Sequence, residues 1–163
     1  MEEDEIMIHL EDVTKENFFE VISLWDTLDE SEKRSVAPNS ISIAQAYVNQ
    51  DRAWPQVIYN DQEIVGFLML ALHDDDIPPV DQPAYYLWRL MIKKNAQGKG
   101  YGKEVLSIIK KKCANDHQKT LYVTCTMHSP MPYQFYINNG FIDTLEMDDD
   151  EQILRMEIKD GKL

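Results

Sequence analysis

The sequence has 163 residues, in which 29 Asp and Glu stand against 16 Lys and Arg, so the formal net charge is −13. The length suits one domain, residues 1–163, and a hydrophobic fraction of 44% excludes intrinsic disorder as the main state. The acid excess argues against nucleic acid and anionic membranes as partners, because both are held chiefly by Lys and Arg. It favours cationic partners instead.

The first residues of the sequence have no basic region and no apolar stretch of the kind found in signal peptides. The longest apolar run, residues 64–72, is too short to span a bilayer. We therefore expect a soluble cytoplasmic protein. The two cysteines, Cys113 and Cys125, fit no zinc or redox spacing, so we expect small buried side chains and no disulfide.

Hydrophobic periodicity in the first half predicts a strand, two helices and two further strands. Thr14 is the expected N-cap of the first helix, and a polar stretch, residues 29–39, separates the two helices. A three-residue link, residues 60–62, is short enough for a hairpin. In chain order, the predicted elements are residues 6–13, 14–28, 40–49, 56–59 and 63–72.

The second half begins with an acidic loop, residues 73–83, which contains three prolines and connects to the next strand. The elements predicted after it are residues 84–92, a long helix ending near 116, and residues 121–126, 130–139, 141–145 and 152–158. The resulting order is β-α-α-β-β-β-α-β-α-β-β. This order predicts a mixed α/β sheet, because a doubly wound fold would alternate regularly.

Positive charge is concentrated in residues 89–112, where eight bases stand against one acid and give a charge of +7. The rest of the chain has eight bases against 28 acids, a charge of −20. We expect the lysines of residues 93–103 to face an anion, and residues 110–112 to form a solvated helix face.

A glycine-rich loop, residues 97–103, lies between a predicted strand and a predicted helix, where backbone N–H groups can hold an anion. The nucleotide triphosphatase motif fails, because Gln97 and Glu104 stand where it needs glycine and a hydroxyl residue. The dinucleotide motif also fails, because Lys103 or Val105 stands where its last glycine belongs.

Two spaced motifs resemble the GNAT superfamily of N-acetyltransferases. Gln97, Gly100 and Gly102 match the form Gln/Arg-x-x-Gly-x-Gly/Ala of its pyrophosphate loop. Downstream, Tyr136 and the pair Gly140-Phe141 match its Tyr-x-x-x-Gly-Phe signature, and the order of predicted elements agrees with this family. The resemblance implies a GNAT-like acyl-CoA N-acyltransferase fold with acetyl-CoA as co-substrate and no metal.

The resemblance also implies roles for individual residues. The central strand would pair with the pantetheine arm, its backbone N–H groups would polarise the thioester carbonyl, and the loop would hold the pyrophosphate, with Lys93 and Lys94 adding charge nearby. Tyr136 aligns with the family's general acid, although a core aromatic is the alternative. Ser129 stands where many members have an asparagine that contacts the coenzyme. The implied coenzyme contacts are Leu90, Met91, Ile92, Gln97, Gly98, Lys99, Gly100, Tyr101, Gly102, Lys103 and Ser129.

The charge pattern favours a small cationic amine as acceptor, most of all a polyamine such as spermidine or spermine, and residues 40–47 resemble bacterial diamine acetyltransferases. Alternatives are an aminoglycoside, a protein N-terminus, or a coenzyme-binding module without catalysis. Dimerisation is common in the family, and no sequence feature decides whether this chain forms a homodimer. The candidate acceptor contacts are Trp25, Glu30, Asp74, Asp75 and Trp88. The tryptophans are equally plausible as core residues, and acid clusters of this kind more often belong to a solvated loop.

Overall fold

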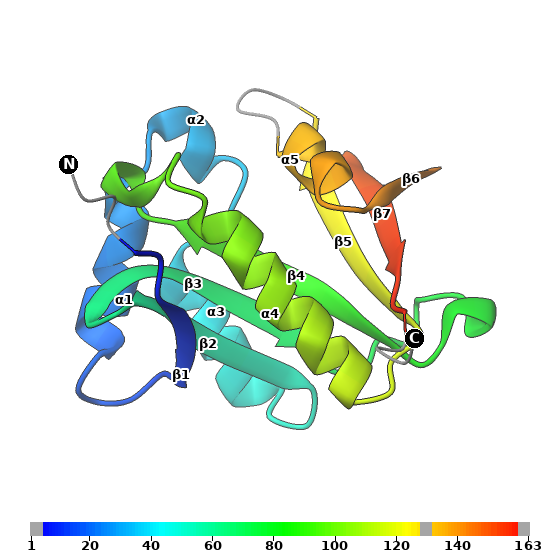
Figure 1. Ribbon diagram of the computed structural model, residues 1–163, viewed down its shortest axis with the longest axis horizontal. Coiled ribbons are helices and arrows are strands. Elements are labelled where there is room, and N and C mark those ends of the chain that lie inside the picture. Colours follow the sequence, from blue (N-terminus) through cyan, green and yellow to red (C-terminus); the bar gives the residue numbers. More distant parts are fainter. Residues whose placement is uncertain (1–4, 128–131, 160–163) are drawn as a thin grey trace.

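The computed structural model describes residues 5–127 and 132–159, which form a seven-stranded sheet in the order β1-β2-β3-β4-β5-β7-β6 (Figure 1). The strands are β1 (Ile8–Asp12), β2 (Ala53–Asn60), β3 (Glu63–Ala71), β4 (Ala84–Ile92), β5 (Thr120–Thr126), β6 (Ile142–Asp148) and β7 (Glu151–Glu157). The helices are α1 (Phe18–Ser23), α2 (Glu30–Lys33), α3 (Asn39–Val48), α4 (Tyr101–Asn115) and α5 (Tyr133–Asn138). Short 3-10 turns lie at Leu24–Thr27, Pro79–Asp81 and Lys94–Ala96.

The mixed α/β sheet confirms the predicted fold class, and each predicted strand is present with small shifts at its ends. The predicted cap of the first helix is wrong. The helix begins at Phe18 because the side chain of Asn17 accepts a hydrogen bond from the N–H of Thr14 at 2.8 Å and donates to the carbonyl of Asp12 at 3.0 Å. These bonds hold residues 12–17 in a turn, so the helical turns start after it.

The polar stretch between the first two predicted helices contains a further short helix, α2. Its start is a capping box, in which the backbone N–H of Asp29 donates to Glu32 Oε1 at 3.1 Å. One turn is too short to produce a hydrophobic periodicity, which is why the sequence pattern does not reveal it. The last predicted helix begins at Tyr133, and its expected first residues 130 and 131 lie outside the described residues.

The sheet opens between its two central strands. Strands β4 and β5 run parallel and pair only over Ala84–Leu87 and Thr120–Val123. Beyond this pairing β4 remains joined to β3, whereas β5 remains joined to β7. Figure 1 shows the two halves spreading apart toward the end of the sheet where α2 and α5 lie. The fold therefore leaves one edge of β4 without a partner strand over its last residues.

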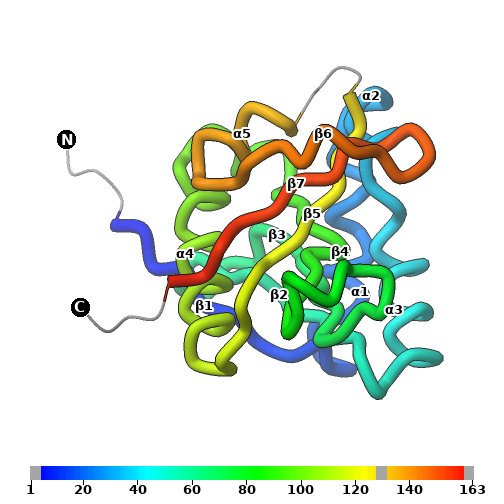
Figure 2. Tube along the Cα trace, turned by 90° about the vertical axis from the view of Figure 1, so that its right-hand side faces the viewer, coloured from blue at the N-terminus to red at the C-terminus, as the bar shows by residue number. Residues whose placement is uncertain are grey.

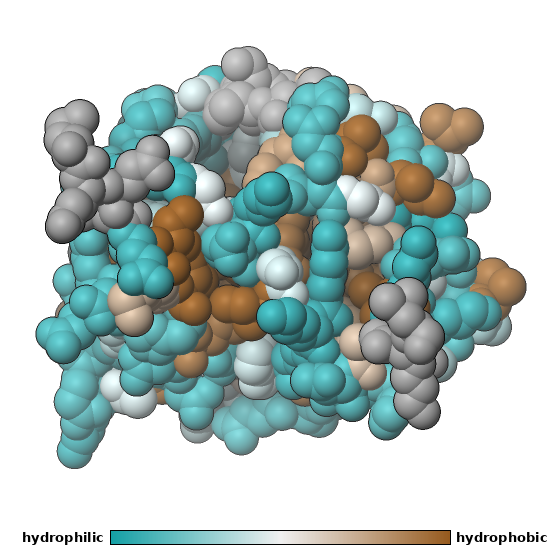
Figure 3. All heavy atoms as spheres, viewed as in Figure 1, coloured by the Kyte–Doolittle hydropathy of each residue, from teal (hydrophilic) through white to brown (hydrophobic). Residues whose placement is uncertain are grey.

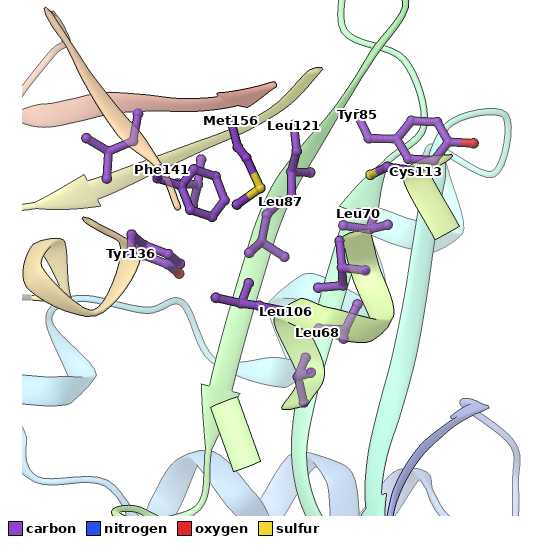
Figure 4. Packing of buried hydrophobic residues seen from close by; sticks show 14 of the residues in the cluster. Leu68, Leu70, Tyr85, Leu87, Leu106, Cys113, Leu121, Tyr136, Phe141 and Met156 are labelled. Atoms are coloured by element: carbon purple, nitrogen blue, oxygen red, sulfur yellow. The ribbon is translucent and has the colours of Figure 1, made fainter. Parts of the chain in front are cut away.

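Helices cover both faces of the sheet. Helix α4 lies on one face, and α1 and α3 lie on the other (Figure 2). Because both faces are covered, every residue of β3 after Glu63 is buried. Figure 4 shows the larger core, in which Leu106 of α4 packs toward Leu87 and Leu121 of the central strands. The smaller core lies under α1 and α3 and includes Phe67 and Met91.

On the α4 side, hydrophilic residues cover most of the surface, and apolar groups show through between them (Figure 3). Within residues 5–127 and 132–159, no helix combines the length and the apolar character needed to cross a membrane.

Candidate functional site

A cavity of about 970 Å³ lies where β4 and β5 separate. Most of its walls come from five segments: the stretch from Glu32 to Pro38, β4 from Tyr86 onward, the glycine loop with the start of α4, the middle of β5, and α5. Leu28 and Glu151 of β7 complete the lining. A second hollow of about 700 Å³, beside β1 and α1, contains none of the predicted site residues. The larger cavity is thus the candidate site.

The glycine loop has the backbone shape that its sequence predicts. Gly98 and Gly100 have φ values of +78° and +85°, which are left-handed conformations that side-chain-bearing residues rarely adopt. Helix α4 starts directly afterwards at Tyr101, and residues 100–103 line the cavity. Since the first N–H groups of a helix have no partner within the helix, this end of the cavity presents free donors and a positive dipole to an anion.

Gln97 fixes the base of the loop. Its side-chain Nε2 donates to the carbonyl of Ile92 at 3.0 Å and to Glu32 Oε2 at 2.8 Å. It therefore ties the end of β4 to α2, which contributes to the opposite wall. The glutamine of the motif positions the loop as well as lining the cavity.

Two lysines of the basic segment are neutralised by acids of the protein. Lys94 Nζ lies 2.7 Å from Asp29 Oδ2 and 2.9 Å from Glu32 Oε1, and Lys93 Nζ lies 2.6 Å from Glu63 Oε1. Burial opposes ionisation of Glu32, but the hydrogen bonds from Lys94 and Gln97 outweigh it and lower the pKa of that carboxyl. Lys93 and Lys94 are therefore engaged by acids of the protein, and their expected contribution of charge near the coenzyme's phosphates stays a prediction.

Lys99 and Lys103 have no ion-pair partner among the residues that the structure describes. Lys103 lines the cavity, whereas Lys99 does not. Of the four lysines in residues 93–103, Lys103 is thus the one whose charge reaches the cavity without a neutralising acid.

The open edge of β4 exposes the backbone of alternate residues, because neighbouring residues of an antiparallel strand point their N–H and C=O groups to opposite edges. The N–H of Lys93 donates to Val65 of β3 at 2.8 Å, and the carbonyl oxygen of Met91 faces Gly66 of β3. Leu90 and Ile92 therefore direct their backbone groups toward the edge that β5 leaves open. The structure separates the three expected contacts, since the backbone of Met91 faces β3.

Tyr136 is held rigidly on α5. It is 7% exposed, and its ring meets Phe141 edge-on at 5.3 Å between centroids (Figure 4). Its hydroxyl points toward β4, the residue lines the cavity, and no hydrogen bond to this hydroxyl is formed within the described residues. Burial raises the pKa of Tyr136 well above 10, with smaller contributions from Cys125 and Tyr86. At neutral pH the side chain is a protonated phenol.

The two expected tryptophan contacts are already paired with cations of the protein. Trp88 lines the cavity, but the guanidinium of Arg52 lies 4.9 Å and that of Arg89 5.8 Å from its ring centre. Trp25 does not line the cavity; Lys33 Nζ lies 4.9 Å from its ring centre. A cationic amine would compete with these contacts for the same aromatic faces.

The expected acidic contacts do not line the cavity. The side chain of Glu30 is 92% exposed and lies 3.6 Å from Lys33. Asp74 and Asp75 belong to the loop that precedes Ala84, the first residue of β4, whereas β4 separates from β5 near its last residues. Asp74 accepts the N–H of Asp76 at 3.0 Å. The structure therefore does not bring the candidate acceptor contacts Glu30, Asp74 and Asp75 to the cavity lining. Ser129 lies outside the described residues.

Sequence reasoning missed a row of polar side chains across the cavity wall. Tyr86 Oη lies 2.7 Å from Thr124 Oγ1, and Thr124 donates to Glu151 Oε2 at 2.8 Å. All three residues line the cavity, together with Arg89. Tyr86 and Thr124 stand in predicted strands, but nothing local marks Glu151, which follows a run of three aspartates where β6 ends and the chain turns into β7.

No group of three His, Cys, Asp or Glu side chains in residues 5–127 and 132–159 has the geometry to hold a metal ion. Cys113 and Cys125 are buried free thiols, as predicted, and burial raises the pKa of Cys113 to about 12 and that of Cys125 to about 11.

Comparison with known proteins finds a matching family model and similar solved structures. The family model described as the acetyltransferase (GNAT) family matches residues 9–141. The sequence matches none of the curated proteins with which it was compared. An acetyltransferase from Thermus thermophilus has a similar structure, with a TM-score of 0.72 at 19% identity over 93% of this chain and 97% of that one.

Two similar structures contain a coenzyme. The PaiA N-acetyltransferase from Thermoplasma acidophilum, in complex with coenzyme A, gives a TM-score of 0.65 at 18% identity over 93% of this chain and 99% of that one. A GNAT family acetyltransferase from Elizabethkingia anophelis with acetyl-CoA bound gives 0.66 at 17% identity over 95% and 99%. At these identities the likeness shows the fold.

Proposed function

The chain belongs to the acetyltransferase (GNAT) family, and we propose that its cavity transfers the acetyl group of acetyl-CoA to a primary amine of a small acceptor. One observation carries the proposal. A single cavity is lined by the glycine loop, by the open edge of β4 and by Tyr136. These are the three parts that the reaction needs, namely an anion site, a strand edge and a proton donor.

The residues present fit the coenzyme. Left-handed Gly98 and Gly100 and the start of α4 offer backbone donors to a pyrophosphate, and Lys103 adds a positive charge. The open backbone of Leu90 and Ile92 offers the hydrogen bonds that an added strand would make, although Gln97 occupies the carbonyl of Ile92. The bound coenzymes of the two similar structures support the same assignment.

When bound, acetyl-CoA supplies an activated acetyl thioester. The chain then has two tasks. The N–H of Leu90, on the open edge, donates to the thioester carbonyl oxygen and stabilises the negative charge that develops there. Tyr136, which burial keeps protonated, donates its proton to the departing sulfur. The amine nitrogen bonds to the acetyl carbon as the carbon–sulfur bond breaks, and the proton that the nitrogen loses passes to water, from which Tyr136 is reprotonated.

The chemical class of the acceptor is the more specific part of the proposal. The net charge of −13 supports the polyamine expected from the sequence, because an acidic protein attracts polycations over long range. Spermidine and spermine therefore belong in the set of amines to be tested. The cavity lining supports a second class of acceptor, an amine that also carries a carboxylate, because Arg89 lines the cavity and has no acidic partner among the described residues.

The test is release of free thiol from acetyl-CoA in the presence of the purified protein and a set of amines: spermidine, spermine, an aminoglycoside, a peptide N-terminus and amino acids. We expect thiol release with at least one class and none without amine. Binding of coenzyme A in calorimetry, combined with no acetyl transfer to any amine, would instead indicate a coenzyme-binding module and overturn the proposal.

A further inference from the structure

We infer that Arg89 binds a carboxylate of the acceptor, so that the substrate is a small amine that also carries a carboxylate, such as an α-amino acid. This inference rests on the proposed function, because it concerns the acceptor side of the same cavity. Arg89 follows Trp88 on β4, close to where the pairing with β5 ends.

The hydrogen bonds of Arg89 leave its charge uncompensated. One terminal nitrogen donates to the carbonyl of Trp88 at 2.9 Å, and the other donates to the side-chain oxygen of Gln45 at 3.3 Å. Both acceptors are neutral. The Nε atom is buried without a partner, and no carboxylate within the described residues forms an ion pair with this arginine.

Such an arrangement is costly to the free protein. Removing a guanidinium from water is unfavourable unless an anion and hydrogen bonds compensate it, and burial accordingly lowers the pKa of Arg89. Tyr86 and Glu151 are close enough to favour the charged form of Arg89, but the hydrogen bonds of Arg89 go to Trp88 and Gln45. A carboxylate in the cavity would provide the missing charge, and the planar guanidinium is suited to binding it through two parallel bonds.

The other charged residues of the cavity also favour an acceptor that carries a carboxylate. Lys33, Arg34 and Lys103 also line it. Its two carboxylates are Glu32, which Lys94 and Gln97 already engage, and Glu151. A polycation would therefore find one carboxylate without a cationic partner and several repelling cations.

A molecule with one ammonium and one carboxylate matches this lining better. Glu151 accepts a hydrogen bond from Thr124 and keeps further acceptor capacity for an ammonium group. Arg89 lies within electrostatic reach of Glu151. Arg89 and Glu151 are thus two opposite charges that line one cavity, and they complement the carboxylate and the ammonium of a zwitterion.

The experiment compares acceptors that differ only in charge at one end: amino acids and their amides. We expect wild-type kcat/KM to be higher for the acid than for its amide by roughly tenfold to hundredfold, the range for a charged hydrogen bond. Arg89→Gln should reduce this ratio to near one. Arg89→Lys keeps the positive charge but loses the planar guanidinium that can make two parallel hydrogen bonds, so it should give an intermediate ratio.

Arg52→Gln is the matched control, because Arg52 also lies over the ring of Trp88 but does not line the cavity. Its acid-to-amide ratio should equal that of the wild type. If the acid-to-amide ratio of kcat/KM fell to near one in both Arg89→Gln and Arg52→Gln, the effect would come from the packing of Trp88, and the inference would be overturned. Circular dichroism and the melting temperature establish that each variant is folded.

A second readout does not need turnover. Calorimetry of the coenzyme A-loaded protein should show acids binding about tenfold or more tightly than amides, and Arg89→Gln should abolish this difference. Equal affinity of wild type for acids and amides, or acetylation of spermidine in preference to every acid, would contradict the inference while leaving acetyl transfer intact. Absence of acetylation with every amine would instead contradict the proposed function.

Discussion

The hydroxyl of Tyr86 lies 2.7 Å from Thr124 Oγ1, and this hydrogen bond joins β4 to β5 at the point where their backbone pairing ends. Thr124 passes the connection on to Glu151 of β7 at 2.8 Å. Three strands that form the cavity walls are thereby linked through side chains. The row holds the two halves of the sheet at a fixed separation where the backbone no longer does.

Thr124→Val should weaken this link. The change removes both hydrogen bonds and leaves the Tyr86 hydroxyl, whose pKa burial raises, without its partner. We expect a loss of about 1–3 kcal/mol in the free energy of unfolding, measured with urea. Thr144→Val is the control, because it also removes two hydrogen bonds, one to the carbonyl of Ile153 and one from the N–H of Glu146, but in the outer hairpin away from the cavity. Equal losses in the two variants would mean that the row adds nothing beyond two ordinary hydrogen bonds.

Tyr136→Phe should lower kcat by roughly 10²- to 10⁴-fold, the usual contribution of a general acid. Its affinity for coenzyme A in calorimetry should remain that of the wild type, because the ring still packs on Phe141. Tyr133→Phe is the matched control, since Tyr133 stands on the same helix, donates to Asp143 at 2.9 Å and does not line the cavity. Undiminished turnover in Tyr136→Phe would remove this residue from the mechanism.

Lys103→Gln should weaken coenzyme A binding by about tenfold, because one charged hydrogen bond to a phosphate is lost. The dependence of the dissociation constant on salt should become shallower at the same time. Lys111→Gln serves as the control, since Lys111 is exposed farther along α4 and does not line the cavity. If both substitutions weaken binding equally, the effect comes from net charge and not from a local contact.

Glu32→Gln should destabilise the link between α2 and the glycine loop in a pH-dependent way. The folded-state pKa of Glu32 lies below its ordinary value of 4.5, so its charge stabilises the fold above that pH, and the stabilisation is lost as the pH falls through the lowered folded value. We expect the wild type to exceed the variant by up to about 1 kcal/mol at neutral pH, because the side chain is partly solvated.

Urea unfolding at neutral and acidic pH checks this expectation, with Glu30→Gln as the control for an exposed neighbour. The difference between wild type and Glu32→Gln should shrink at acidic pH, whereas Glu30→Gln should match the wild type throughout. A difference that grows on acidification would reverse the sign and contradict the assignment.

Cys113 and Cys125 should not react with an aromatic disulfide reagent at neutral pH while the protein is folded. Both thiols are buried, and their pKa values of about 12 and about 11 keep the reactive thiolate scarce. Both should react once urea unfolds the chain. Rapid modification of either thiol in the native protein would show that its part of the core opens readily.

Local patterns were sufficient for much of the fold. The strand over residues 84–92 has the predicted bounds, because an apolar and aromatic run ends abruptly at two lysines. The left-handed Gly98 and Gly100 follow from glycines placed between that strand and a helix. Helix α2 escaped prediction, since a single turn held by Asp29 and Glu32 has no periodicity.

The acceptor side of the cavity was beyond local reasoning. The loop containing Asp74 precedes β4, so it lies at the end of the strand opposite the opening, a fact that depends on where β5 separates. Trp88 meets Arg52 through a contact between distant segments, and Trp25 meets Lys33 only because the chain turns back between α1 and α2. Glu151 reaches the cavity because β7 pairs with β5. No sequence motif near Glu151 predicts this pairing.

The central claim is that the cavity at the open edge of β4 acetylates a small amine. Mass spectrometry of the amine set after incubation with acetyl-CoA and purified protein tests it most directly. We predict that at least one amine gains a single acetyl group in amounts equal to the thiol released, and that Tyr136→Phe forms roughly 10²- to 10⁴-fold less product in the same time. Binding of the coenzyme without acetylation of any amine would contradict the claim.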